Sequence, residues 1–165
     1  MSDAHRKHAV SCVGCAVVTV SDTRATATDT SGALIRDLLT AAGHNVVSYE
    51  ILRDDPGQVR VRVGILCETK PVDAIILTGG TGLAPRDTTY EAVAGLLEKR
   101  LDGFGELFRM LSFHEIGASA MLSRAVAGSR GRTAIFSLPG STPAVRLAME
   151  RLILPELGHI AGLIR

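Results

Sequence analysis

The sequence contains no tryptophan and only two tyrosines, and its charged residues almost cancel, leaving a formal net charge of +1. Proteins that bind nucleic acid by general electrostatics carry an excess of positive charge. Proteins that bind single strands usually stack the bases on aromatic side chains. Because both features are scarce, the composition argues against nucleic acid as a binding partner.

Long apolar runs and paired cysteines are also missing. No apolar stretch reaches the roughly 18 residues that a membrane helix requires, and the polar residues 1–12 do not resemble a signal peptide. Three cysteines, an odd number, do not make a disulfide framework. These absences predict a reduced, cytoplasmic protein that does not associate with a membrane.

The remaining composition is that of a globular protein. A chain of 165 residues with 46% hydrophobic and 21% charged residues fits a single domain. We expect a flexible N-terminal tail over residues 1–12 and one domain over residues 13–165. The mean hydropathy of +0.24 is slightly high for a soluble chain, which suggests that some apolar surface lies between subunits.

Strand-like and helix-like segments alternate along the chain. The predicted strands are 13–20, 44–53, 72–78 and 132–138, and the predicted helices are 31–42, 58–69, 88–100, 104–113, 119–126 and a last one after 139–143. Segment 58–69 also alternates like a strand, but Asp55-Pro56 is a typical helix start. Pro155 is expected to kink or restart the last helix. The alternation predicts a three-layer α/β/α domain with a mostly parallel sheet.

Polar and glycine-rich segments follow the predicted strands, where ligands bind in open α/β sheets. The segment Thr78, Gly79, Gly80, Thr81 and Gly82 follows the third strand. By itself such a segment is most often a tight turn, and it matches neither a Walker motif nor a dinucleotide fingerprint. Exposed backbone N–H groups beside a helix start nevertheless favour an anion such as phosphate.

Two aspartates in these segments have no evident structural task. Asp55 can cap the following helix, which leaves Asp54 unassigned. Thr88 can cap the next helix in a capping box with Glu91, which leaves Asp87 unassigned. Because Mg²⁺ in proteins is held by one or two carboxylates and by substrate phosphates, the pair suggests a magnesium site.

Other groupings have simpler interpretations. The spacing of His5, His8, Cys12 and Cys15 is compatible with zinc, although Cys15 lies inside the first predicted strand. The segment between Ile116 and Met149 holds arginines and no acidic residue, which indicates a solvated basic face or an anionic ligand. Those arginines are Arg124, Arg130, Arg132 and Arg146. His114 and His159, near predicted helix ends, can complement the helix dipole.

Several motifs occur in an order that matches one known family. They are VSDTR (20–24), DTSG (29–32), LTGGTGLAPRDTTYEA (77–92), GFGELFRMLSFHEIGASAMLSRAVAG (103–128), LPGS (138–141) and ILPE (153–156). The chain resembles the molybdenum-cofactor biosynthesis proteins of the MoaB and Mog type, relatives of the gephyrin G domain. The resemblance implies a MoaB/Mog-like fold, usually assembled as a homotrimer or a dimer of trimers.

The resemblance also implies an activity, the Mg²⁺-dependent transfer of adenylyl from ATP to molybdopterin with release of pyrophosphate. The family's two important aspartates fall on Asp54 and Asp87, which would act catalytically and hold the metal. Residues implied to bind the substrates are Thr78, Gly79, Gly80, Thr81, Gly82, Ser123, Pro139, Gly140 and Ser141. The alternatives are a MoaB-type protein that binds molybdopterin without adenylylating it, and a trimeric scaffold like the gephyrin G domain.

The chain departs from the family pattern at three places. Arg53 stands where proline usually precedes the first aspartate, and Tyr90 stands where proline is frequent. The usual LPGSP has its last proline one position late, at Pro143. The shifted proline affects the expected shape of the nucleotide loop.

Overall fold

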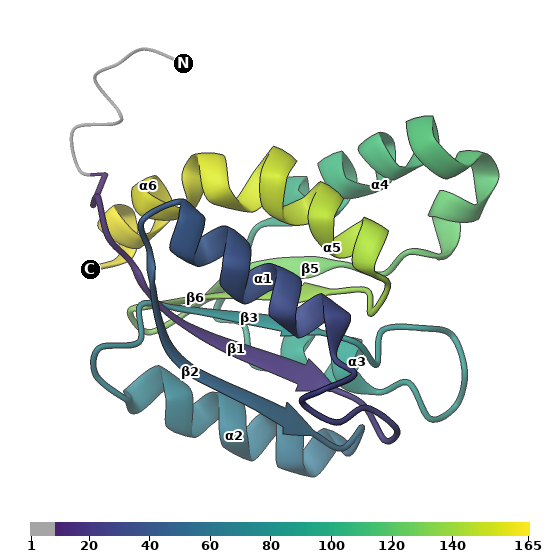
Figure 1. The fold of residues 1–165 in the computed structure, drawn as a ribbon, viewed down its shortest axis with the longest axis horizontal. Helices are drawn as coiled ribbons and strands as arrows, with labels where there is room; N and C mark the ends of the chain where they lie inside the picture. The colour runs from purple at the N-terminus through teal and green to yellow at the C-terminus, as the bar shows by residue number, and fades with distance from the viewer. Residues whose placement is uncertain (1–8) are drawn as a thin grey trace.

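A computed structural model describes residues 9–165 of the chain, and it shows a twisted sheet between two layers of helices (Figure 1). The six strands lie in the order β2-β1-β3-β6-β5-β4. They are β1 (Gly14–Val20), β2 (Asn45–Leu52), β3 (Ala74–Thr78), β4 (Lys99–Arg100), β5 (Val126–Arg130) and β6 (Thr133–Leu138). Neighbours among β2, β1, β3 and β6 are parallel, and β5 is antiparallel to both β6 and β4. The predicted mostly parallel α/β sheet is confirmed.

Helices cover both faces of the sheet. They are α1 (Thr30–Ala41), α2 (Pro56–Glu68), α3 (Thr89–Ala94), α4 (Asp102–Ile116), the 3₁₀ helix η2 (Gly117–Leu122), α5 (Thr142–Ala148), the π-helical turn η3 (Met149–Ile153) and α6 (Leu154–Ile164). Helices α1, α4, α5 and α6 lie on one face, and α2 and α3 lie on the other (Figure 1). This is the predicted three-layer arrangement.

Strand β1 is buried along its whole length because both of its faces meet a helical layer. Alternate residues point to opposite faces, so Val17 joins the core beneath α1 and α5 while Val18 joins the core above α2. An uninterrupted apolar run is the expected sequence of such a central parallel strand. Two separate hydrophobic cores therefore fix the position of β1, and with it the loop that follows.

Segment 56–68, which the sequence left ambiguous, is a helix. The Asp55 carboxylate accepts a hydrogen bond from the backbone N–H of Gln58 at 2.7 Å, and Pro56 begins the helix. Helix α2 buries Val59, Val63 and Leu66 against the sheet. It supplies the crossover that two parallel strands need.

The helix predicted over residues 88–100 is wrong beyond Ala94. Helix α3 ends at Ala94 with Gly95 as its C-cap, and Lys99 and Arg100 form β4, an edge strand paired with β5. The backbone N–H of Leu101 donates to the carbonyl oxygen of Ala127, which extends this pairing. Leucine, glutamate and lysine are good helix formers, but pairing with β5 outweighs that weak local preference.

The helix predicted over residues 119–126 forms only as far as Leu122, as part of the 3₁₀ helix η2, and is wrong beyond that residue. Gly117, with φ of 63°, ends α4, and the chain continues as η2 and then as strand β5. Strands β5 and β6 form a hairpin whose connection contains Gly131 in a left-handed conformation, with φ of 53°. Such a glycine in a two-residue connection is a hairpin signal.

The C-terminal helical segment restarts where the sequence predicted. After α5 the chain makes one π-helical turn over 149–153, and α6 then begins with Pro155 at its second position. Pro155 has no N–H to donate, and the π-helical turn lies directly before it, where the regular i→i−4 hydrogen bonding of the helix is interrupted. No helix in the described part of the chain is both long enough and apolar enough to cross a membrane.

Candidate functional site

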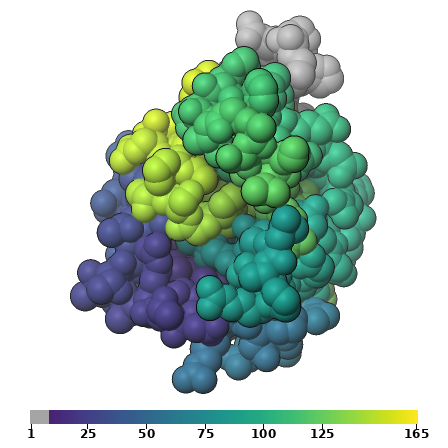
Figure 2. Space-filling view, turned by 90° about the vertical axis from the view of Figure 1, so that its right-hand side faces the viewer, coloured from purple at the N-terminus to yellow at the C-terminus, as the bar shows by residue number. Residues whose placement is uncertain are grey.

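A cavity of about 310 Å³ lies at the carboxyl ends of the central strands. Its lining comes from the loop after β1, the end of β2, the glycine loop after β3 and the turn after β6. The lining residues are Thr19, Val20, Ser21, Asp22, Thr23, Arg24, Ser31, Asp54, Thr78, Gly79, Gly80, Arg86, Asp87, Gly140 and Ser141. Figure 2 views this edge, where the purple loop after β1, the teal loop after β3 and the yellow-green start of α5 come together.

The strand order explains why the cavity forms there. The chain moves from β1 outward to β2 and then crosses back over β1 to β3, so the connections leave β1 and β3 in opposite directions. At such a switch point the loops after the two strands separate and leave a crevice for a ligand. The predicted convergence of polar residues at one sheet edge is confirmed.

The first two glycines of the loop are required by backbone geometry. Gly79 and Gly80 have φ of 102° and 64°, which side chains with a Cβ rarely adopt. A Cβ on Gly79 would lie 2.2 Å from the carbonyl oxygen of Val20, and one on Gly80 would lie 2.5 Å from Oδ2 of Asp54. The loop therefore brings bare backbone against both the end of β1 and a carboxylate of the cavity.

The turn after β6 completes this wall. The hydroxyl of Thr78 donates to the carbonyl oxygen of Pro139 at 2.9 Å, and the N–H of Gly79 donates to the carbonyl oxygen of Leu138 at 3.0 Å. Gly140 lies against Gly79, and Ser141 is the residue before α5. The two segments implied to bind substrate thus lie side by side, despite the shifted proline.

Asp54 and Asp87 both line the cavity. Oδ1 of Asp54 accepts hydrogen bonds from the hydroxyls of Thr88 and Thr89 at 3.3 Å and 3.2 Å. Oδ2 of Asp87 accepts a bond from the N–H of Ala84 at 3.2 Å. In each carboxylate the other oxygen has no hydrogen-bond partner within residues 9–165, so a divalent cation could use it. Two carboxylates with one free oxygen each fit the ligand preference of Mg²⁺.

The capping box that set Asp87 apart does not form. Thr88 makes no side-chain cap, because its hydroxyl donates to Asp54 instead. The carboxylate of Glu91 pairs with Arg124 rather than with the helix start. Asp87 nevertheless caps no helix in the structure, as the sequence analysis expected, and its side chain lines the cavity instead.

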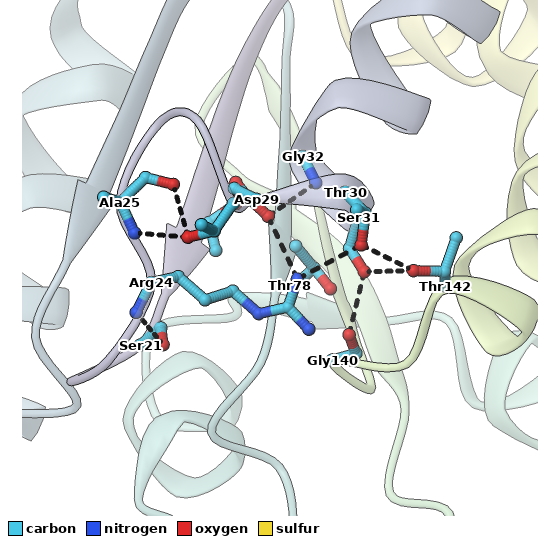
Figure 3. A network of polar contacts seen from close by, with 12 residues as sticks. Ser21, Arg24, Ala25, Asp29, Thr30, Ser31, Gly32, Thr78, Gly140 and Thr142 are labelled. Atoms are coloured by element: carbon cyan, nitrogen blue, oxygen red, sulfur yellow. Dashed lines mark hydrogen bonds and ion pairs between the residues drawn. The ribbon is translucent and has the colours of Figure 1, made fainter.

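A buried polar cluster around Asp29 supports the opposite wall, and the sequence analysis assigned it no role (Figure 3). Asp29 precedes α1, and its Oδ1 accepts a bond from the N–H of Gly32 at 2.9 Å. Its Oδ2 accepts bonds from the hydroxyls of Thr19 at 2.5 Å and Tyr49 at 2.7 Å. The signal was available in the motif DTSG, because aspartate before a serine and glycine is a typical helix start.

The start of α1 is in turn tied to the turn after β6. The hydroxyl of Ser31 donates to the carbonyl oxygen of Gly140 at 2.9 Å, and the hydroxyls of Thr30 and Thr142 are 3.0 Å apart (Figure 3). Arg24 reaches the same start, with Nη1 3.7 Å from Oδ1 of Asp29. Asp29 therefore positions two walls of the cavity through α1.

The ionisation of Asp29 should make stability depend on pH. Burial alone would raise its pKa, but hydrogen bonds from Thr19, Gly32 and Tyr49, together with the charge of Arg24, lower the pKa below the ordinary 3.8. Asp29 thus stabilises the fold above its unfolded-state pKa of about 4, and this contribution is lost as the pH falls through its folded-state pKa. We expect Asp29→Asn to lose about 1–3 kcal/mol at neutral pH and less near pH 3, measured by urea denaturation. An equal loss at both pH values would contradict this assignment.

Four of the residues implied to bind substrate do not line the cavity: Thr81, Gly82, Ser123 and Pro139. Thr81 is buried, and Pro139 contributes the carbonyl oxygen that accepts from Thr78. Ser123 follows η2, one residue before Arg124, whose guanidinium donates to the carbonyl oxygens of Thr81 and Gly82. This arginine thus contacts the loop backbone and is not simply part of a solvated basic face.

The described residues give no support to the zinc interpretation. Cys15 is fully buried in β1, and burial raises the pKa of its thiol to about 12, whereas Cys12 is exposed. His5 and His8 lie outside the described residues. Within residues 9–165 no three or more histidine, cysteine, aspartate or glutamate side chains are grouped to hold a metal.

The fold and the motifs match known proteins. Residues 16–159 match the family described as a probable molybdopterin binding domain. The chain is 55% identical to molybdenum cofactor biosynthesis protein B of Halalkalibacterium halodurans, covering 96% of this chain and 94% of that protein. It is 49% identical to the Bacillus subtilis protein of the same name, covering 98% and 95%.

Solved structures agree with this assignment. A crystal structure of a molybdenum cofactor biosynthesis protein B, 54% identical, covers 92% of this chain and 95% of its own with a TM-score of 0.90. The tungsten cofactor synthesizing protein MoaB from Pyrococcus furiosus, 37% identical, covers 95% and 99% with a TM-score of 0.84. With the cavity, the glycine loop and the order of motifs, these matches show that the chain belongs to the probable molybdopterin-binding domain family, as a MoaB/Mog-type member.

Proposed function

We propose that the protein, which has a role in molybdenum cofactor biosynthesis, adenylylates molybdopterin with Mg²⁺-ATP and releases pyrophosphate. The observation that carries the proposal is the meeting of Asp54, Asp87 and the glycine loop in one cavity. Relatives named for this biosynthesis, at 49% and 55% identity over nearly the whole chain, support the pathway.

The reaction requires no protein base. An oxygen of the terminal phosphate of molybdopterin attacks the α-phosphorus of ATP, and the bond from that phosphorus to the pyrophosphate oxygen breaks. A phosphate monoester has a second pKa of about 6, so it is already largely anionic at neutral pH. The protein's task is therefore to hold two polyanions in line and to stabilise the charge that moves onto the leaving group.

The charges of the lining show how this task would be divided. Three aspartates (Asp22, Asp54 and Asp87) and two arginines (Arg24 and Arg86) line the cavity, an excess of one negative charge. A triphosphate would be repelled by this lining unless a divalent cation accompanied it. When bound, Mg²⁺ would supply that positive charge, held by Asp54 and Asp87.

The other lining groups would then orient the substrates. The N–H groups of residues 80–83 are available for phosphate or pterin oxygens, because they have no acceptor within the described part of the chain. Ser141, at the start of α5, is exposed and would lie on the nucleotide side. The guanidinium of Arg86 is exposed in the loop before Asp87 and can approach a phosphate.

A second function, molybdopterin binding without adenylylation, is favoured by the names of the relatives, which are proteins B of this biosynthesis. The two functions separate in one mixture of the protein with molybdopterin, ATP and Mg²⁺. We expect pyrophosphate release that depends on all three. Molybdopterin binding without any pyrophosphate release would establish the binding function instead.

We also propose that the protein assembles as a homotrimer or a dimer of trimers. Large apolar side chains on α4 and η2 are exposed in the single chain: Leu107, Met110, Phe113, Ile116, Met121 and Leu122. This surface, the α4–η2 surface, forms the green ridge at the top of Figure 2. A monomer rarely leaves so many neighbouring large apolar side chains in water.

Phe113→Asp is expected to convert the assembly to monomers, because the charge would have to be buried in the interface. Light scattering after size exclusion measures the change. Val61, on the exposed side of α2 and 65% exposed, provides the control, and Val61→Asp should keep the trimer. A wild-type protein that is monomeric at micromolar concentration would contradict the proposal.

A further inference from the structure

The side chain of Arg124 holds the glycine loop although it does not line the cavity. Its Nε donates to the carbonyl oxygen of Thr81 at 2.9 Å, and its Nη2 donates to that of Gly82 at 2.7 Å. The side chain is only 22% exposed. Two parallel bonds from one planar group fix the direction of both carbonyls.

The same guanidinium binds helix α3. Its Nη1 and Nη2 contact the carboxylate of Glu91, and its carbon lies 4.9 Å from the centre of the Tyr90 ring. The hydrogen bond from Arg124 lowers the pKa of the Glu91 carboxyl. Arg124 therefore joins two loop carbonyls to the first turn of α3.

Helix α3 is also bonded to the loop directly. The N–H of Thr89 donates to the carbonyl oxygen of Gly80 at 2.9 Å, and its hydroxyl donates to Asp54 at 3.2 Å. Arg124 and Glu91 add a second connection, two residues further along the loop. The loop is thus fixed to α3 at two points.

The loop segment so fixed lies against both aspartates. A Cβ on Gly82 would lie 2.4 Å from Oδ2 of Asp87, and one on Gly80 would lie 2.5 Å from Oδ2 of Asp54. Because the loop backbone lies this close to the two carboxylates, any displacement of the loop changes the surroundings of both. In a trans peptide the N–H also points opposite to the carbonyl, so Arg124 directs the N–H groups of Gly82 and Leu83 away from itself.

We propose that Arg124 is a positioning residue: by holding the carbonyls of Thr81 and Gly82 to α3, it sets the glycine loop against Asp54 and Asp87 and tunes the affinity of these aspartates for a divalent cation. The inference deepens the proposed function, and its metal part depends on the magnesium site proposed above. Tyr90, a departure from the family pattern, contributes by packing beneath the guanidinium.

The first test uses Mn²⁺ alone as the probe, with binding followed by electron paramagnetic resonance. Loss of a group that orients metal ligands typically weakens metal binding by about 10–100-fold, and we expect this range for Arg124→Ala. Arg124→Lys should recover part of the affinity, because one ammonium cannot donate in parallel to two carbonyls. Added guanidinium ion should partly restore Mn²⁺ binding to Arg124→Ala.

The matched control is Arg62→Ala, which removes another arginine–glutamate pair. Arg62 bonds Glu50 with Nε 2.7 Å from Oε1, and neither residue lines the cavity. The Arg62→Ala variant should lose about as much free energy of unfolding as Arg124→Ala but keep the Mn²⁺ affinity of wild type. Equal weakening in Arg62→Ala and Arg124→Ala would show a general loss of stability and overturn the proposal.

Hydrogen exchange of the backbone amides of Gly79 and Thr89, which donate to the carbonyl oxygens of Leu138 and Gly80, provides a readout independent of the reaction when it is measured without metal or substrate. We expect faster exchange in Arg124→Ala than in wild type, and no change in Arg62→Ala. Unchanged exchange and unchanged Mn²⁺ affinity in Arg124→Ala would overturn the inference. If wild type bound no Mn²⁺, the proposed magnesium site would fail, and the exchange would still decide whether Arg124 positions the loop.

Discussion

Asp54→Asn and Asp87→Asn are each expected to lower the rate of pyrophosphate release by about 10²-fold or more. Each change removes one of the two negative charges that would hold the cation between the protein and the ATP phosphates, while it keeps the size of the side chain. The amide can still accept a hydrogen bond, from Thr88 and Thr89 at position 54 and from Ala84 at position 87. We therefore expect the fold to survive, which circular dichroism and the thermal midpoint would show.

Asp37→Asn is the control for these variants, because Asp37 is an exposed carboxylate on α1 outside the cavity. It should leave the rate unchanged. Raising the Mg²⁺ concentration should recover part of the activity of each single variant but not of the double variant. A fully active Asp54→Asn/Asp87→Asn protein would refute the metal assignment.

Gly79→Ala is expected to destabilise the fold by about 2–4 kcal/mol, from backbone strain and overpacking together. With φ of 102°, Gly79 has a backbone conformation that alanine rarely adopts, and the added Cβ would lie 2.2 Å from the carbonyl oxygen of Val20. Because that oxygen belongs to the backbone of the central strand, it cannot rotate away. Urea denaturation followed by circular dichroism measures the loss.

Gly64→Ala provides the opposite expectation at another glycine. Gly64 lies inside α2, and an added Cβ would meet no atom within 4 Å. Alanine should stabilise the protein by about 0.5–1 kcal/mol, because glycine is a poor residue for a helix interior. A tolerated Gly79→Ala, with a stability like that of Gly64→Ala, would mean that the loop can adopt another path.

The central part of the fold was predictable because its signals are local. The apolar run of β1 indicates a buried strand, and Asp55 with Pro56 indicates the start of a helix, each within a few residues. The structure agrees with both predictions. The cavity was predictable for a different reason. Parallel strands joined by crossovers must end at one edge, so residues such as Asp54 and Asp87 meet there whatever their separation along the chain.

The antiparallel edge was not predictable from local preference. Lys99, Arg100 and Val126 are strand residues only because each has a partner across the sheet, and nothing in their immediate neighbours states that pairing. The role of Arg124 was missed for the same reason. It contacts Thr81, 43 positions away, and Glu91, 33 positions away. A basic residue in a basic segment gives no indication that its partners are carbonyl oxygens.

The cavity wall joins residues far apart in the chain, with Ser31 bonded to Gly140 across 109 positions. During synthesis the N-terminal half emerges from the ribosome first, so a nascent chain that ends before β6 cannot yet form the complete cavity. A ligand of this cavity, such as the proposed nucleotide substrate, could then bind only a nearly finished molecule, and by mass action its binding would stabilise the whole domain instead of an early intermediate.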